Sequence, residues 1–437
     1  MRISVIGCGY LGAVHAACMA KLGHEVVGID VDEKKIKELS GAVAPFYEPG
    51  LEELLKDVQE TGRLIFTTDV SAARGSDVHF ICVGTPQKKG ENAADLTYVD
   101  AAASALVPYL SAGELVVGKS TVPVGTAARL AEMIASSAPD VHLVWNPEFL
   151  REGHAVSDTL QPDRFVYGVE GGSEDHPAVG ILDRIYATPL SAGTPRLVTD
   201  HPTAELVKTA ANSFLATKIS FINAMAELCE AAGADVTRLA DAIGLDDRIG
   251  RKFLNAGIGF GGGCLPKDIR AFMARAGELG ADQALTFLRE VDAINMRRRT
   301  RVVELTRELC SGSLLGKRVT VLGAAFKPES DDVRDSPALS IAAQLQLQGA
   351  VVTVTDPKAL ENAARRFPEL QYEADPESAV TGADALLLLT EWQEYRDLDP
   401  HLVGELVSSR HILDGRNVLD KAKWRAAGWS YRGLGRP

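Results

Sequence analysis

Short apolar runs alternate with helical patterns through the first two hundred residues. The strand-like runs are ISVIG, EVVGID, LIFTT, VHFICVG, ELVVGKS and VHLVWN, and residues 10–22 and 32–39 have helical patterns. Alternation of this kind predicts a parallel, doubly wound sheet that is covered by helices.

Residues 202–232 break this alternation. Pro202 suits a first helical turn and Gly233 suits a helix end, so the pattern predicts one continuous helix. About thirty residues in helical conformation make a rod roughly 45 Å long. We expect such a helix to be a spine between domains or a dimer interface, and not part of the sheet.

The last third of the chain returns to strand and helix alternation. Its strand-like runs are RVTVLGAAF, AVVTVTD, ADALLLLT and RHILDG, and residues 336–348 have a helical pattern. The predicted fold class is therefore α/β, with two Rossmann-like doubly wound domains joined by a long central helix. The expected domains are 1–200, 201–312 and 313–437.

Composition narrows the class of protein. The 437 residues are 46% apolar and 24% charged, as in soluble globular proteins. Six cysteines lie far apart without a C-x-x-C pair, which argues against a zinc site and a disulfide framework and for a reducing compartment; no metal is expected. We find no signal peptide and no apolar run that could span a bilayer, so a cytoplasmic location is expected.

The formal net charge of −13 disfavours nucleic acid and anionic membranes as partners. It leaves small anionic ligands possible, because local basic groups can outweigh the overall field.

The strand ISVIG leads into the sequence G-x-G-x-x-G, formed by Gly7, Gly9 and Gly12. These glycines permit a tight turn and a close approach of the backbone to a pyrophosphate at a helix N-terminus. Asp30 ends the second strand, eighteen residues after Gly12, where a carboxylate accepts hydrogen bonds from a ribose. The pattern predicts a dinucleotide site that favours NAD over NADP; a simple tight turn is the alternative.

The C-terminal run VTVLGAAFKP lacks the three glycines, so no second dinucleotide is expected there. Lys327, at the end of this strand, either meets a ligand in a cleft between domains or is an ordinary surface lysine.

The stretch GFGGGCLPKD places Cys264 after three glycines and before Lys267 and Asp268. Glycines leave the sulfur unshielded, and a nearby cation such as Lys267 lowers the pKa of a thiol. Cys264 is therefore a candidate nucleophile, with an inert, partly buried cysteine as the alternative.

Three further clusters carry possible chemistry. Lys208 and Asn212 are four residues apart on one face of the long helix, where they can stabilise an oxyanion or belong to an ordinary surface. Thr121 follows a strand in STVPVGT. Glu148 and Glu152 in NPEFLREG are four apart, which suits a proton acceptor and a water-orienting group, or a solvated helical edge.

Together these motifs resemble the UDP-glucose/GDP-mannose dehydrogenases. The resemblance runs nearly end to end, through VIGCGYLG, VGTP, STVPVGT, NPEFLREG, ELVKTAANSFLATKISFINA, RIGRKFLNAGIGFGGGCLPKD and AFKPESDDVRDSP. It implies an N-terminal NAD domain, a central helical dimerisation region and a C-terminal nucleotide-sugar domain. It also implies two successive oxidations of a primary alcohol to a carboxylate with two NAD, UDP-glucose being the leading substrate.

The resemblance also implies roles for particular residues. Cys264 would be the nucleophile, Lys208, Asn212 and Asp268 would handle the oxyanion and the proton, and Thr121, Glu148 and Glu152 would position water and act as acid and base. NAD would contact Gly7, Gly9, Tyr10, Leu11, Gly12, Asp30, Lys35, Thr85, Thr121, Glu152, Lys267 and Arg334. The substrate would contact Glu148, Phe149, Leu150, Arg151, Glu152, Lys208, Asn212, Phe253, Leu254, Asn255, Ala256, Gly257, Gly261 and Lys327, and Arg248 would reach the substrate of a neighbouring subunit.

One position departs from the family pattern. The residue before the cysteine is commonly serine in the family and is Gly263 here, so the loop gains backbone freedom and loses a hydroxyl.

Several alternatives stay open at this stage. The same chemistry can act on GDP-mannose or on a UDP-N-acetylhexosamine. A two-electron hydroxyacid dehydrogenase would not need Cys264, and a silent NAD-binding regulator would need none of Cys264, Lys208 and Asp268.

Overall fold

The computed structural model describes residues 1–436, which form two compact units. Unit 1 contains Met1–Ala211 and Arg270–Gly280, and unit 2 contains Asn212–Ile269 and the chain from Ala281 on. The three-domain boundaries expected from the sequence stay a prediction.

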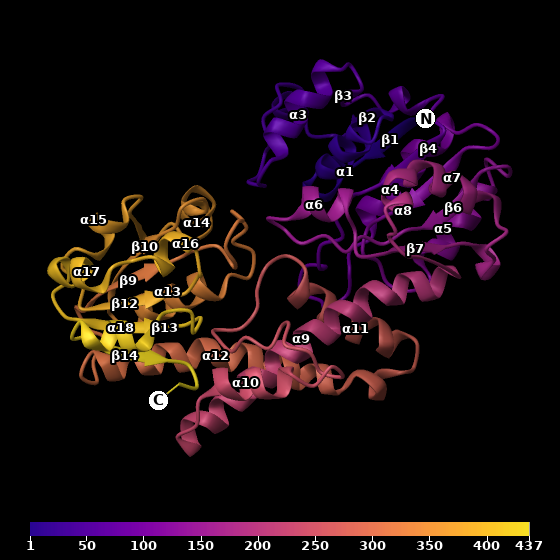
Figure 1. Cartoon of the computed structure of the whole chain (residues 1–437). Coiled ribbons are helices and arrows are strands. Elements are labelled where there is room, and N and C mark those ends of the chain that lie inside the picture. The colour runs from indigo at the N-terminus through magenta and orange to yellow at the C-terminus, as the bar shows by residue number, and fades with distance from the viewer. Residues whose placement is uncertain (437) are drawn as a thin grey trace. The chain divides into compact units, whose positions relative to one another are not determined.

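Unit 1 contains a sheet of eight strands (Figure 1). In sheet order the strands are β3 (Leu64–Thr67), β2 (Glu25–Ile29), β1 (Arg2–Ile6), β4 (Val78–Ile81), β5 (Leu115–Gly118), β6 (His142–Trp145), β7 (Phe165–Gly168) and β8 (Arg196–Thr199). The first six are parallel in the Rossmann order 3-2-1-4-5-6. β7 pairs antiparallel with β6, and β8 pairs parallel with β7.

Two hydrophobic cores cover the two faces of this sheet. Ile3 and Val5 of β1 belong to one core and Ile6 to the other, as alternate positions of a strand require. Helices α1 (Tyr10–Lys21) and α3 (Leu51–Glu60) pack in the first core, and α4 (Thr97–Leu106) and α5 (Thr126–Ala135) in the second. The other helices of this unit are α2 (Glu33–Ser40), α6 (Ala155–Leu160), α7 (Pro177–Ile185) and α8 (Ala187–Ser191). The doubly wound sheet predicted from the alternation is confirmed.

Unit 2 contains a six-stranded parallel sheet with the same order. Its strands are β11 (Gln371–Tyr372), β10 (Val351–Thr355), β9 (Arg318–Leu322), β12 (Ala385–Leu388), β13 (His411–Asp414) and β14 (Ser430–Gly433). Its helices are α10 (Val236–Gly244), α12 (Phe287–Leu309), α13 (Pro337–Leu347), α14 (Leu360–Arg366), α15 (Pro376–Val380), α16 (Gln393–Arg396), α17 (Pro400–Leu406) and α18 (Lys421–Ala426). The second Rossmann-like fold is therefore confirmed.

The long helix predicted at 202–232 is α9 (His201–Ala232), which Figure 1 shows as one continuous helix. Phe214, Phe221 and Leu228 recur every seven residues along it and are 65%, 48% and 61% exposed. An exposed apolar stripe at this spacing is typical of a helix that packs on a partner helix. Within residues 1–436, no helix is both long and apolar enough to cross a membrane.

The start of α9 also fixes the start of α5. The Glu205 carboxylate accepts hydrogen bonds from the N–H groups of Gly125 at 2.8 Å and Ala127 at 2.7 Å. Burial raises the pKa of Glu205 to about 7, against the opposing effect of these hydrogen bonds. The folded protein therefore holds a proton on Glu205 between pH 4.5 and 7 that the unfolded chain releases.

We predict that this proton makes the unfolding free energy depend on pH. The stability contributed by protonated Glu205 is fully present near pH 4.5 and is lost as the pH rises through 7. The stability of the wild type relative to Glu205→Gln should fall by about 1–3 kcal/mol between pH 5 and 8 in urea unfolding. The exposed Glu132→Gln serves as control, and parallel curves for wild type and Glu205→Gln would contradict the prediction.

Candidate functional site

The glycine turn after β1 has the geometry that its spacing predicts. Gly7 has a φ of +89°, and a Cβ at Gly12 would lie 1.8 Å from the carbonyl oxygen of Gly7. Gly9 has no heavy atom within 4 Å of the position of a Cβ, so a ligand can approach its backbone. Tyr10 and Leu11 follow in the first turn of α1.

Asp30 follows β2 and is buried beside this turn. Its carboxylate accepts hydrogen bonds from the N–H groups of Cys8 at 2.7 Å and Asp32 at 3.0 Å, and lies 2.8 Å from Lys35 Nζ. The ammonium of Lys35 offsets part of the repulsion that Asp30 exerts on a 2′-phosphate. We therefore expect cofactor preference to depend on both residues.

Thr85 and Thr121 follow the neighbouring strands β4 and β5. The Thr85 hydroxyl donates to the Thr121 carbonyl oxygen at 2.7 Å. The carboxyl ends of parallel strands in an open sheet are where ligands bind, and this hydrogen bond joins two of the predicted cofactor contacts there.

A buried carboxylate that the sequence did not reveal holds the segment after β6. Glu48 accepts hydrogen bonds from the N–H groups of Gly153 at 2.6 Å and Ala155 at 2.7 Å, and from the Tyr10 hydroxyl. Burial and this hydrogen bond raise the pKa of Tyr10, and the charge of Glu152 adds to the effect. Glu48 thereby fixes the backbone next to Glu152.

Glu148 pairs with Lys208 inside unit 1. Glu148 Oε1 lies 3.1 Å from Lys208 Nζ, and Glu148 Oε2 accepts from the Leu150 N–H at 2.6 Å. Lys208 Nζ also lies 5.7 Å from the centre of the Phe149 ring. The structure thus joins two candidate catalytic residues, and Lys208 is buried and not an ordinary surface lysine.

Residues 146–151 have no regular structure, and 152–153 form a turn. The alternative of a solvated helical edge for Glu148 and Glu152 is therefore wrong, because the segment is not helical. Arg151 pairs with Asp158 through two hydrogen bonds, Nε to Oδ2 at 2.9 Å and Nη2 to Oδ1 at 2.6 Å.

Lys119 is a second residue that sequence reasoning missed. It lies buried just after β5 and donates to Asn146 Oδ1 at 3.0 Å. Burial lowers the pKa of Lys119 to about 8, while Cys82 and Glu148 act in the opposite direction. The sequence does contain a signal for Lys119, because this lysine stands between an apolar strand and Thr121.

In unit 2, Cys264 is exposed while the other five cysteines are buried. It directly precedes helix α11 (Leu265–Glu278), and its carbonyl oxygen accepts the N–H of Asp268 at 2.9 Å. The N-terminus of a helix stabilises negative charge, so this position favours a thiolate. An inert buried cysteine is excluded here by its exposure.

Asn212 and Lys267 both bind the buried Asp268. The Asn212 amide donates to Asp268 Oδ2 at 2.6 Å, and Lys267 Nζ lies 2.5 Å from Asp268 Oδ1. The ammonium of Lys267, which the sequence offered to the thiol, is thus engaged by Asp268. The start of α11 is a second local feature that favours the thiolate.

Side chains from distant elements hold the predicted substrate loop. Asn223 of α9 accepts the Gly257 N–H at 2.8 Å, and Asn295 of α12 accepts the Phe260 N–H at 2.7 Å. Of the predicted contacts, Leu254, Ala256, Gly257 and Gly261 are buried, Asn255 is exposed, and Phe253 is exposed with a φ of +67°. Arg416 donates to the Gly259 and Phe326 carbonyl oxygens at 3.3 and 3.0 Å. Sequence reasoning missed Asn223, Asn295 and Arg416.

Gly263 leaves room for Arg334. A Cβ at Gly263 would lie 2.2 Å from Arg334 Cζ, so a serine there would displace the guanidinium. Arg334 pairs with Asp332, its Nη2 lying 2.7 Å from Oδ2. The departure from the family serine therefore has a structural consequence beyond backbone freedom.

Two predicted substrate contacts lie elsewhere in unit 2. Lys327 is half-buried, and its Nζ lies 5.6 Å from the centre of the Phe326 ring. Arg248 is exposed and pairs with Asp246, its Nη2 lying 2.6 Å from Asp246 Oδ2.

Three family models match consecutive parts of the chain. Residues 1–189 match the NAD binding domain of the UDP-glucose/GDP-mannose dehydrogenase family, residues 202–297 its central domain, and residues 320–421 its UDP binding domain. The chain belongs to the UDP-glucose/GDP-mannose dehydrogenase family. It is an NAD-dependent oxidoreductase, and the NAD predicted from the glycine turn is confirmed.

Full-length relatives agree with this assignment. The chain is 42% identical to the UDP-glucose 6-dehydrogenase of Rhizobium meliloti (strain 1021) over all of both chains. It is 43% identical to the UDP-glucose 6-dehydrogenase TuaD of Bacillus subtilis (strain 168), over all of this chain and 93% of the relative. The solved UDP-glucose dehydrogenase of Pyrobaculum islandicum superposes with a TM-score of 0.90 at 39% identity, covering all of this chain and 98% of that one.

The residues of unit 1 fit NAD. Gly9 leaves backbone open for a pyrophosphate at the start of α1, and Asp30 is fixed beside the turn where a ribose hydroxyl would bind.

We predict that Asp30 and Lys35 together set the cofactor preference. Asp30→Ser removes the repelling carboxylate and frees Lys35 for a 2′-phosphate, so the ratio of kcat/KM for NAD to that for NADP should fall by about tenfold or more. Adding Lys35→Ala should cancel the gain with NADP. Glu33→Ser, an exposed carboxylate of α2, is the control; equal kcat/KM for both cofactors in the wild type would contradict the prediction.

Proposed function

We propose that this chain oxidises UDP-glucose to UDP-glucuronate in two successive steps, through a thiohemiacetal and a thioester on Cys264. The observation that carries the proposal is the single exposed thiol at the start of α11, among five buried ones. Relatives that are about 40% identical over their full length and bear the name UDP-glucose 6-dehydrogenase support the choice of substrate.

The first step converts the C6 alcohol to an aldehyde. The hydroxyl proton and the C6 hydride leave. NAD would supply the hydride acceptor, one molecule for this oxidation and a second, bound after the NADH has left, for the next. We assign Lys208 and Asn212 to stabilise the oxyanion and Asp268 to take part in moving the proton. The pairs Glu148–Lys208 and Asn212–Asp268 hold these side chains in defined positions, which supports the assignment.

The second step uses the thiol. The Cys264 sulfur adds to the aldehyde carbon and the carbonyl oxygen takes a proton, which gives a thiohemiacetal. Loss of a hydride and of the hydroxyl proton gives a thioester. Water then attacks the thioester, the carbon–sulfur bond breaks and the thiolate leaves. We assign Thr121, Glu148 and Glu152 to orient this water and to accept its proton.

The remaining assignments concern binding. NAD is assigned to the glycine turn with Tyr10 and Leu11, to Asp30, Lys35, Thr85, Thr121 and Glu152, and to Lys267 and Arg334. The nucleotide sugar is assigned to residues 148–152, Lys208, Asn212, residues 253–257, Gly261 and Lys327. The exposed stripe on α9 supports a homodimer, in which Arg248 reaches the substrate of the partner.

GDP-mannose is the second candidate substrate, because the family includes dehydrogenases of both nucleotide sugars. A panel of nucleotide sugars distinguishes them by kcat/KM.

We predict a yield of two NADH per UDP-glucose, with UDP-glucuronate as product and little free aldehyde. A captive thiohemiacetal keeps the aldehyde bound between the two oxidations. NADH is measured by absorbance at limiting UDP-glucose, and the product by mass. A yield of one NADH with accumulation of a carbonyl product would favour two-electron chemistry.

We predict that Cys264→Ser lowers kcat by several orders of magnitude while UDP-glucose and NAD still bind. A serine forms at best an ester, which lacks a good thiolate leaving group. Intact-mass analysis should find a sugar adduct on the variant or on acid-quenched wild type. Cys310→Ser, at a buried cysteine outside the site, is the control, and near-native turnover of Cys264→Ser would end the thioester proposal.

A further inference from the structure

The C-terminal segment of unit 2 is basic in an acidic protein. Residues 421–436 contain five lysine and arginine residues and no carboxylate, in a chain with a formal net charge of −13. They form α18, β14 and the short segment that follows. None of these residues belongs to the site described above.

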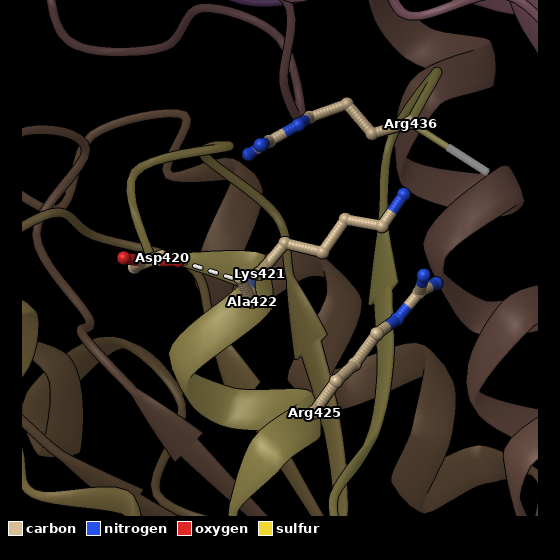
Figure 2. Close-up of a pocket in the computed structure, with 5 residues that line it drawn as sticks. All are labelled: Asp420, Lys421, Ala422, Arg425 and Arg436. Atoms are coloured by element: carbon tan, nitrogen blue, oxygen red, sulfur yellow. Dashed lines mark hydrogen bonds between the residues drawn. The ribbon is translucent and has the colours of Figure 1, made fainter.

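Three of these cations surround one cavity of about 520 Å³. The described residues that line it are Asp420, Lys421, Ala422, Arg425 and Arg436 (Figure 2). Lys421 and Arg425 come from α18, and Arg436 comes from the segment after β14. Figure 2 shows the Lys421 ammonium and the Arg425 guanidinium projecting toward the same space, below the side chain of Arg436.

The three cations are close enough to repel one another. Burial lowers the pKa of Lys421, and the charges of Arg425 and Arg436 lower it further, against the opposing charge of Asp235. Gathering like charges costs free energy that a bound anion would offset.

Two carboxylates near these cations, Asp420 and Asp235, accept hydrogen bonds at helix starts. A third, Glu230, accepts the Gly435 N–H at 3.0 Å. Asp420 accepts the N–H groups of Ala422 and Lys423 at 2.9 and 3.1 Å, and Figure 2 shows its carboxylate directed away from the three cations. Asp235 accepts the Thr237 N–H at 2.8 Å and lies 3.6 Å from Arg436 Nε. That nitrogen is buried and forms no hydrogen bond among the described residues.

We propose that this cavity binds a small anion with two linked phosphate groups. Two guanidinium groups offer fork-shaped donors that match phosphate oxygens. The Lys421 ammonium adds a point charge, which Figure 2 shows on the side of the Arg425 guanidinium. The volume suits a pyrophosphate or a nucleoside diphosphate. The site is separate from the residues assigned to NAD and to the nucleotide sugar, so it goes beyond the proposed function.

The test is calorimetric titration of the full chain, saturated with NAD, with inorganic pyrophosphate at low ionic strength. We expect saturable binding that weakens as salt is added. Lys421→Gln/Arg425→Gln should weaken binding by about tenfold or more, because each charge-assisted hydrogen bond contributes substantially. Both side chains are at least partly exposed, and an unchanged thermal midpoint verifies folding.

Two controls locate the binding. Lys423→Gln removes an exposed lysine of the same helix that does not line the cavity, and should leave the affinity unchanged. Lys327→Ala alters the proposed substrate site and should also leave it unchanged. Titration of UDP and ADP into Lys327→Ala then identifies the source of the phosphates: tighter binding than pyrophosphate indicates a nucleotide, and equal or weaker binding a free polyphosphate.

Three results would overturn the proposal. The first is that pyrophosphate does not bind up to about 10 mM. The second is that Lys423→Gln weakens pyrophosphate binding as much as Lys421→Gln/Arg425→Gln does. The third is that Lys327→Ala abolishes pyrophosphate binding while Lys421→Gln/Arg425→Gln binds it fully. The last result would place pyrophosphate at the substrate site. It would therefore rule out the anion site beside α18 and leave the proposed function intact.

Discussion

The irregular segments that carry the candidate chemistry depend on buried acceptors for their backbone N–H groups. A buried N–H without a partner is costly, so each such segment needs a side chain from elsewhere. Glu48 holds residues 153–155, Glu205 holds residues 125–127, and Asn223 and Asn295 hold Gly257 and Phe260. Candidate residues such as Glu152 lie beside these anchors, so their positions follow from hydrogen bonds made outside the motifs.

In both sheets, a glycine with positive φ follows the strand at the centre of the strand order, but the two turns differ in their surroundings. Gly7 and Gly323 both have positive φ, and each N–H donates at 2.8 Å to the end of the neighbouring strand. In unit 1 the following carboxylate, Asp30, faces a turn with open backbone at Gly9. In unit 2 the corresponding Asp356 accepts from Ala324, Ala325 and the Trp392 indole, so its oxygens are committed within the fold. Asp30 is engaged by donors as well, so the difference between the two turns lies in the backbone, which is open at Gly9 and buried at Ala325.

The sequence predicted the strands, the helix and the turn that depend on a local pattern of residues. Apolar alternation located the ten strands β1–β6, β9, β10, β12 and β13, and the helix α9, while the glycine spacing located the turn. It missed β7, β8, β11 and β14, which are short or lie toward an edge of a sheet. Glu48, Lys119, Asn223, Asn295 and Arg416 were missed for another reason: their partners are tens to hundreds of residues away, and no spacing rule identifies them.

The candidate cations of this acidic chain are already paired with carboxylates. The candidate cations Lys35, Arg151, Lys208, Arg248, Lys267 and Arg334 each pair with a carboxylate of their own unit. Such a partner holds the side chain in place and lowers the local positive charge, so an incoming phosphate or oxyanion must compete with it. We therefore expect a phosphate or oxyanion to bind at these cations by replacing a carboxylate, and selectivity to depend on which anion does so with better geometry. In five of these pairs the carboxylate lies within seven residues of its cation in the sequence. Glu148, sixty residues before Lys208, is the carboxylate that the fold brings to its cation.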